Sequence, residues 1–311
     1  MAHHNTVLAQ LLKLLPRHEF EKLANRQDGK RKASAMTRWT QFVALTIGHL
    51  GGRSSLRDIE ATTQSQSHLN YHLGSQAISR SALGRANERL DYRFFEGLFQ
   101  SLYQRCAHAA PGHTFRFKKK LFSLDASLID VSMKIVPKAK YNCMKAAFKL
   151  HVGLDHDDLI PAFAALTAGK VSDMTHARSL QFPKGSVVVF DKGYNSYEWH
   201  NQLTEQGVFF VTRIRGNAKY RVLERRAVDT GTGITSDQTI EYTSVRASRM
   251  TLAPVRRVGF RDPETGKHYV FVTNQFDWSP KTIADIYKQR WQVELFFKSI
   301  KQNLKIKAFL G

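Results

Sequence analysis

The 311-residue sequence is poor in cysteine, in long apolar runs and in acidic residues, and each shortage excludes a class of protein. Its two cysteines, Cys106 and Cys143, can form neither a disulfide framework nor a cysteine-rich zinc site. The most apolar stretches, such as residues 42–50, are interrupted by polar groups and do not approach the roughly 18 residues of a membrane span. The N-terminus, with His3 and His4, lacks the features of a signal peptide, so we expect neither secretion nor a membrane anchor.

Positive charge is in large excess over negative charge. The chain has 47 Lys and Arg against 26 Asp and Glu, which gives a formal net charge of +21 and a pI near 10.1. This excess favours an anionic polymer as partner, because affinity for nucleic acid depends largely on neutralising phosphates. Hydrophobic residues make up 42% of the chain and aromatic residues 11%, which excludes disorder. The composition therefore predicts a folded protein that binds nucleic acid.

Residues 1–110 predict an all-α domain. Apolar residues recur at helical spacing over residues 37–50, and Ser79 or Ser81 could cap a longer helix that runs past Leu98. A short helix, a turn and this longer helix are compatible with a helix-turn-helix reader of DNA. An all-α bundle with a solvated basic face explains the pattern equally well. The arginines concerned are Arg80, Arg85, Arg89 and Arg93.

From residue 111 the pattern changes to that of an α/β fold. Seven segments predict strands and helices in the order β-β-β-α-β-α-β. In chain order they are residues 121–127, 147–155, 159–167, 175–180, 186–191, 196–206 and 207–214. This order is expected of a ribonuclease H-like core, although several other α/β folds share it.

Two carboxylates have unusual positions on the predicted strands. Asp125 lies inside the first strand between Leu124 and Ala126, where an unpaired carboxylate would be costly. Asp191 ends the β-branched strand of residues 186–191. If the two strands are neighbours, both carboxylates converge where ligands bind in open α/β sheets. Two carboxylates without a Cys or His partner suit a hard cation such as Mg²⁺.

A third carboxylate lies on a helix predicted over residues 280–304. Tyr287, Glu294 and Lys301 follow at seven-residue intervals and form one stripe, and Arg290 lies about 40° to its side. An apolar stripe runs beside them, so we expect the polar groups at the edge of the core. One carboxylate among three phosphate-binding groups fits a metal-dependent phosphodiester site, in which the glutamate binds the metal and the others hold the DNA backbone.

Six residues give the chain a resemblance to a known family: Asp125, Asp191, Tyr287, Arg290, Glu294 and Lys301. Their order and spacing, with Tyr-x2-Arg-x3-Glu-x6-Lys, resemble the DDE-type insertion-sequence transposases of the Tyr-Arg-Glu-Lys signature group. The stretch FDKGYNSY from Phe190 resembles the motif around the second aspartate of that family. The N-terminal segment resembles a helical domain of unknown function found at the front of one subgroup.

The resemblance implies a ribonuclease H-like catalytic domain over residues 111–311, with a mostly β insertion at about residues 215–276. It implies that Asp125, Asp191 and Glu294 are catalytic and bind two Mg²⁺ ions, for which Mn²⁺ can substitute. These ions would activate water and then a DNA 3′-hydroxyl for attack on phosphodiesters.

The resemblance also implies an activity and its partners. The chain would cut the ends of an insertion sequence and join them to target DNA, and Tyr287, Arg290 and Lys301 would hold the phosphate backbone. The N-terminal domain would recognise the terminal inverted repeats in double-stranded DNA. Two copies would act as a homodimer on paired ends, in the bacterial cytoplasm at the nucleoid.

Two other functions stay open from the sequence. The chain ends at Gly311, ten residues after Lys301, whereas family members usually continue. One alternative is therefore a C-terminally truncated, non-catalytic DNA-binding regulator of transposition. A nuclease without strand transfer is the other alternative. The presence of Asp125, Asp191 and Glu294 favours catalysis over binding alone but does not separate a transposase from a nuclease.

Overall fold

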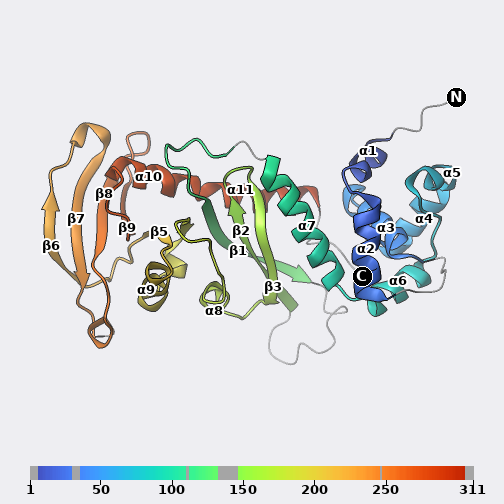
Figure 1. Cartoon of the computed structure of the whole chain (residues 1–311), viewed down its shortest axis with the longest axis horizontal. Coiled ribbons are helices and arrows are strands. Elements are labelled where there is room, and N and C mark those ends of the chain that lie inside the picture. The colour runs from blue at the N-terminus through green and yellow to red at the C-terminus, as the bar shows by residue number, and fades with distance from the viewer. Residues whose placement is uncertain (1–5, 30–35, 110–111, 132–145, 246, 305–311) are drawn as a thin grey trace. The chain divides into compact units, whose positions relative to one another are not determined.

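A computed structural model describes residues 6–29, 36–109, 112–131, 146–245 and 247–304 (Figure 1). His3, His4, Cys143 and Gly311 lie outside these ranges. The chain divides into two compact units. The first comprises Met1–His108, Ile129–Ala147 and Lys298–Gly311, and the second comprises Ala109–Leu128 and Phe148–Phe297. None of the helices in the described ranges is long and apolar enough to cross a membrane.

The described part of residues 1–109 has helices as its only regular elements. They are α1 (Val7–Lys13), α2 (Arg17–Asp28), α3 (Arg38–Leu50), α4 (Leu56–Ser65), α5 (Ser67–Asn70), η1 (Tyr71–Leu73), α6 (Arg80–Arg89) and α7 (Arg93–Ala109). In four of them a Ser or Thr hydroxyl accepts a hydrogen bond from the backbone N–H three residues on, which satisfies an otherwise unpaired donor. These capping residues are Thr6, Thr37, Ser55 and Ser79.

The prediction of a single helix from Ser79 past Leu98 is wrong. Leu90 has extended backbone angles (φ −85°, ψ 129°) and ends α6, and its side chain is buried in the core. Asp91 then accepts a hydrogen bond from the backbone N–H of Arg93 at 2.9 Å, and α7 begins there. The four arginines of this segment are all exposed, so their exposure fits both a DNA-reading surface and a solvated face.

The second unit is built on a mixed sheet, in which nine strands are described in the order β3-β2-β1-β4-β5-β9-β8-β7-β6. The strands are β1 (Leu121–Val131), β2 (Ala146–Asp155), β3 (Ile160–Ala168), β4 (Val187–Phe190), β5 (Phe209–Arg213), β6 (Tyr220–Arg226), β7 (Ile234–Tyr242), β8 (Val255–Arg261) and β9 (His268–Thr273). The pairs β1–β4 and β4–β5 are parallel. Strands β6 to β9 form an antiparallel meander that continues the same sheet beyond β5.

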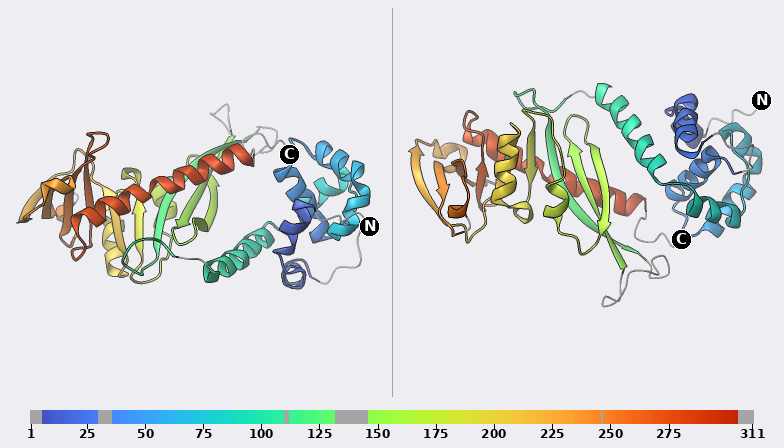
Figure 2. Two further views of the ribbon diagram at one scale, coloured as in Figure 1. Left: turned by 90° about the horizontal axis from the view of Figure 1, so that it is seen from above. Right: turned by 60° about the horizontal axis from the view of Figure 1, so that its bottom comes forward.

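Helices cover both faces of this sheet (Figure 2). They are α8 (Asp173–Ala177), α9 (Tyr197–Glu205), α10 (Pro280–Gln289) and α11 (Trp291–Asn303). Because side chains alternate along a strand, Val188 and Phe190 of β4 pack with α9, whereas Val187 and Val189 pack with α10. All four are fully buried, as expected of a strand covered on both faces.

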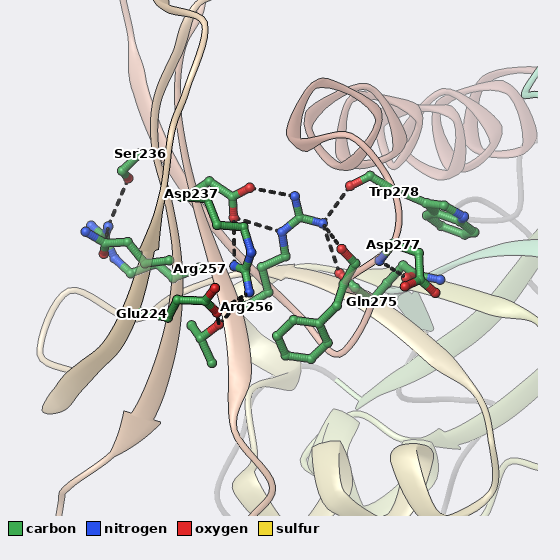
Figure 3. A network of polar contacts seen from close by, with 12 residues as sticks. Glu224, Ser236, Asp237, Arg256, Arg257, Gln275, Asp277 and Trp278 are labelled. Atoms are coloured by element: carbon green, nitrogen blue, oxygen red, sulfur yellow. Dashed lines mark hydrogen bonds and ion pairs between the residues drawn. The ribbon is translucent and has the colours of Figure 1, made fainter.

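A buried ion pair joins the meander to the start of α10 (Figure 3). Arg256 on β8 is 2% exposed and Asp237 on β7 is 4% exposed. Nε and Nη2 of Arg256 donate to the two carboxylate oxygens of Asp237 at 2.8 and 2.7 Å. Nη1 donates to three carbonyls of the loop that leads into α10, those of Gln275, Phe276 and Trp278, at 3.4, 3.0 and 2.6 Å.

We expect Arg256→Met to lower the free energy of unfolding by roughly 3 to 5 kcal/mol, because it leaves the Asp237 carboxylate buried without its main partner. The double variant Arg256→Met/Asp237→Leu should recover part of this loss, since both charges are then removed. Urea unfolding followed by tryptophan fluorescence measures both changes. Arg221→Ala, which removes an exposed ion pair with Glu241, is the control and should have little effect. Wild-type stability of Arg256→Met would contradict the expectation.

His200 on α9 is a buried titratable group, 4% exposed, and its ring stacks on Phe210 with centroids 4.4 Å apart. Neither ring nitrogen has a hydrogen-bond partner among the described residues. Burial lowers the pKa of His200 to about 3, so the folded state favours the neutral ring. The stability that depends on a neutral His200 is therefore fully present above pH 6.5, the ordinary pKa of histidine. It decreases as the pH falls from 6.5 toward 3, because the unfolded chain then binds a proton that the folded chain does not.

We expect His200→Phe to reduce the sensitivity of the fold to acid. Between about pH 7 and pH 4.5 the wild type should lose roughly 2 to 3 kcal/mol more stability than the variant, because only the wild type must keep a buried imidazole neutral. Urea unfolding at the two pH values measures the difference. His268→Phe, at an exposed position, should keep the wild-type acid sensitivity. Equal acid losses in the wild type and His200→Phe would exclude His200 as the cause.

Candidate active site

The register of two parallel strands brings Asp125 and Asp191 together. In the β1–β4 pair, Leu124 lies opposite Phe190. The residue that follows each of them along the chain is an aspartate, Asp125 after Leu124 and Asp191 after Phe190. Neighbouring strands are about 4.8 Å apart, and the two aspartates therefore lie side by side at the C-terminal end of β4. This pairing meets the condition under which the two carboxylates were expected to converge.

The backbone after β4 orients the Asp191 side chain. Asp191 precedes the 3₁₀ turn η2 (Lys192–Tyr194), and its Oδ1 accepts a hydrogen bond from the N–H of Gly193 at 2.7 Å. A Cβ atom at position 193 would lie only 2.8 Å from that oxygen, so a side chain there would displace the carboxylate. Glycine at this position thus permits the close approach that fixes Asp191.

The helix predicted over residues 280–304 is interrupted, so the prediction of one continuous helix is wrong. Arg290 separates α10 from α11, although its backbone angles stay in the right-handed helical region. Hydrogen bonds three residues apart surround it: Arg290 N–H donates to the Tyr287 carbonyl at 3.1 Å, and Val293 N–H donates to the Arg290 carbonyl at 3.2 Å. The tight turn places Tyr287 on α10 and Glu294 on α11.

Arg290 connects the helical and strand parts of the site. Its Nη2 donates to Oε1 of Glu294, and its Nη1 lies 3.9 Å from Oδ2 of Asp125. The guanidinium carbon is 5.7 Å from the centroid of the Tyr287 ring. The Arg290 side chain is 15% exposed. The second unit therefore gathers Asp125, Asp191, Tyr287, Arg290 and Glu294, five of the six residues singled out from the sequence.

Lys301, the sixth, lies seven residues after Glu294 in the last turn of α11, within the part of that helix that belongs to the first unit. Its expected contact with the DNA backbone stays a prediction.

Burial dominates the electrostatics of the site. It raises the pKa of Asp125 to about 6, and the negative charges of Asp191 and Glu294 act in the same direction. The N–H of Ala126, which donates to Asp125 Oδ1 at 2.8 Å, and the charge of Arg290 oppose the rise in pKa. Three carboxylates thus influence one another in a partly buried setting, and such a group gains stability from additional positive charge.

The donor chemistry of these residues fits a hard divalent cation. Carboxylate oxygens are the protein ligands that Mg²⁺ prefers, and a cation would offset the repulsion that contributes to the raised pKa of Asp125. Within the described ranges, no three His, Cys, Asp or Glu side chains are already close enough to hold a metal ion. The guanidinium of Arg290 instead contacts both Asp125 and Glu294.

A pocket of about 390 Å³ lies beside Tyr287 and Arg290, between α10 and the strands β5, β8 and β9. It combines cationic and aromatic side chains, among them Arg213, Tyr269, Lys288 and Trp291. None of these four was predicted from the sequence. Lys288 and Trp291 adjoin signature residues and could have been found there. Arg213 and Tyr269 come together only through strand pairing, with the guanidinium carbon 5.1 Å from the ring centroid.

Comparison with known proteins extends to most of the chain. Residues 116–310 match the family described as a transposase DDE domain, and residues 3–76 match a domain of unknown function, DUF4372. "Putative transposase y4zB" of Sinorhizobium fredii is 34% identical over 182 residues, which are 57% of this chain and 51% of that protein. "Probable transposase for insertion sequence element IS5377" of Geobacillus stearothermophilus is 28% identical over 233 residues, 74% of this chain and 60% of that protein.

The chain thus spans between about half and three fifths of the length of these two relatives. A solved piggyBac transposase synaptic complex with hairpin DNA has a TM-score of 0.47 and 11% identity, over 97% of this chain and 69% of that one. The DDE domain match covers more than half of the chain and includes Asp125, Asp191 and Glu294. On this evidence the chain belongs to the family of transposases with a DDE domain.

Proposed function

We propose that the chain is a DNA transposase that cuts the ends of an insertion sequence and joins them to target DNA. The observation that carries this proposal is the β1–β4 register, which sets Asp125 beside Asp191, together with Arg290, which contacts both Asp125 and Glu294. Carboxylates from two strands and a helix, next to a guanidinium and a phenol, provide both kinds of group that phosphodiester chemistry requires.

In this proposal Asp125, Asp191 and Glu294 hold Mg²⁺, for which Mn²⁺ can substitute. The metal, when bound, supplies Lewis-acid stabilisation of a phosphodiester and lowers the pKa of an attacking hydroxyl. Arg290 contributes N–H donors that can grip a phosphate through two oxygens, and Glu294 orients that guanidinium. The ring of Tyr287 packs against Arg290, and its hydroxyl lies next to that guanidinium.

We also propose a division of labour between a helical N-terminal domain and a catalytic domain. The order β1, β2, β3, α8, β4, α9, β5, with helices on both faces, supports a ribonuclease H-like core, and β6 to β9 are the insertion between Asp191 and Glu294. The helical domain of residues 1–110 would recognise the terminal inverted repeats, and residues 111–311 would catalyse the reaction. Two copies would act together on double-stranded DNA in the bacterial cytoplasm.

We expect Asp125→Asn, Asp191→Asn and Glu294→Gln each to abolish Mg²⁺-dependent cleavage, with a loss of roughly 100-fold or more, because each removes a metal ligand. Binding of DNA should change little. The measurement is a gel assay of purified protein with DNA from the ends of its own element, in which joined products, cut products or neither separate a transposase, a nuclease and a binding protein. Asp229→Asn, at an exposed turn, should keep wild-type cleavage. Near-wild-type cleavage by one triad variant would remove that residue from the site.

Arg290 tests the phosphate-holding part of the proposal. Arg290→Ala should lower both the cleavage rate and the lifetime of the complex with element ends, and Arg290→Lys should restore only part of either, because lysine acts as a point charge. Lys301→Ala should lower the same two quantities. Lys301→Arg should keep more of both than Arg290→Lys does. Cleavage rate and complex lifetime are measured at one fixed salt concentration. Wild-type values for Arg290→Ala would reduce Arg290 to a structural ion-pair partner.

A further inference from the structure

A second pocket of the second unit lies next to the turn that follows Asp191. Its volume is about 410 Å³, which is within the range of small-ligand sites, roughly 300 to 1,000 Å³. It shares no lining residue with the pocket beside Arg290. The charged, polar and aromatic side chains of its lining come from the end of α8, the start of α9 and the turn before it, the β5–β6 connection and β7. These residues are Arg178, Asn195, Tyr197, His200, Arg215 and Tyr242.

Two arginines give this pocket positive charge. Nη2 of Arg178 lies 3.6 Å from Oε2 of Glu198 and donates to the hydroxyl of Ser196 at 3.1 Å, yet 47% of the Arg178 side chain stays exposed. Arg215 is exposed, and among the residues that the structure describes no carboxylate lies within ion-pair distance of it. Two guanidinium groups therefore line the pocket, Glu198 pairs with Arg178, and the surplus positive charge favours an anionic ligand.

The start of α9 adds backbone donors to the same pocket. This nine-residue helix begins at Tyr197, and the side chain of its N-cap residue Ser196 caps no backbone N–H of the first turn; its hydroxyl donates to the Glu198 carboxylate instead. The first N–H groups of a helix have no partner within the helix, and they attract anions together with the helix dipole. Phosphate is the anion that such an end and two arginines bind well.

The pocket also has an aromatic side and an unsatisfied polar group. The rings of Tyr197 and Tyr242 lie with centroids 4.4 Å apart at an interplanar angle of 41°. His200 lines the pocket, and neither of its ring nitrogens has a hydrogen-bond partner in the described part of the chain, although the residue is buried. A buried imidazole without partners is costly, and a ligand or its water can relieve that cost.

We propose that this pocket binds a nucleotide of a DNA strand, with Arg178, Arg215 and the start of α9 on its phosphate and Tyr197 and Tyr242 against its sugar or base. The identification of the ligand as DNA rests on the proposed function. Asn195 in the pocket is four residues after Asp191, so a strand held here passes near the candidate active site. Phosphate contacts and stacking on tyrosine carry little sequence information, and the site therefore accepts any sequence.

The test is DNA binding by Arg215→Ala and by Arg178→Ala/Arg215→Ala, using the full chain without divalent metal. The probe is a labelled single strand of about 12 nucleotides, followed by fluorescence anisotropy over a range of salt concentrations. We expect Arg215→Ala to weaken binding by roughly threefold or more and the double variant by roughly tenfold or more, with a salt slope reduced by about 0.7 per lost contact. Since Arg215 is exposed, its single variant should melt like the wild type.

Arg221→Ala is the matched control, because Arg221 is an exposed arginine paired with a glutamate outside the pocket. Its affinity should stay close to the wild-type value. If the pocket variants bind no more weakly than Arg221→Ala, the proposal is overturned. Competition with deoxyadenosine monophosphate separates the two sources of the ligand: a mononucleotide that competes as well as the oligonucleotide would assign the pocket to free nucleotides and overturn the role in holding a strand.

The absence of divalent metal keeps this test independent of cleavage. If the pocket variants bind DNA more weakly but the wild type cuts no DNA when divalent metal is added, the pocket is supported and the proposed function is excluded. Unchanged binding by those variants in a chain that cuts normally would remove the pocket alone.

Discussion

The ion pair between Arg256 and Asp237 is the interaction on which the geometry of the candidate site depends. The guanidinium of Arg256 donates hydrogen bonds to the Asp237 carboxylate and to three carbonyls of the loop before α10. The meander β6–β9 and the helix that leads to Arg290 are thereby fixed to each other. Arg256 thus fixes the loop from which the helical half of the site begins, and burial strengthens these hydrogen bonds.

The other half of the site is set by the sheet. The register of β4 is difficult to shift, because a one-residue slip would exchange the side chains that pack against α9 with those that pack against α10. Val187–Phe190 of β4 is buried on both faces, so Asp191 is held at a fixed height beside Asp125. Arg290 connects this rigid edge to α11. The site is therefore assembled from a strand pair and a helix that meet through one guanidinium.

The sequence predicted the elements whose signals are local. The helix over residues 37–50 and the strand over residues 186–191 are observed as α3 and β4, because capping, spacing and β-branching act within a few residues. The turn at Arg290 was missed, since arginine favours helices and no breaker stands there. The pairing of Arg256 with Asp237, the meander as a continuation of the sheet and the pocket at Arg215 arise from strands distant in sequence. The domain limits and the roles of the site residues stay predictions.

Strand β6 closes the order of the sheet, and its position has a consequence for self-association. An edge strand presents unpaired backbone donors and acceptors, which invite another chain to add to the sheet. Four of the seven residues of β6 are charged: Arg221, Glu224, Arg225 and Arg226. Such side chains oppose the edge-to-edge stacking that leads to aggregation. The long sheet can therefore end in solvent at β6 without inviting a second chain to extend it.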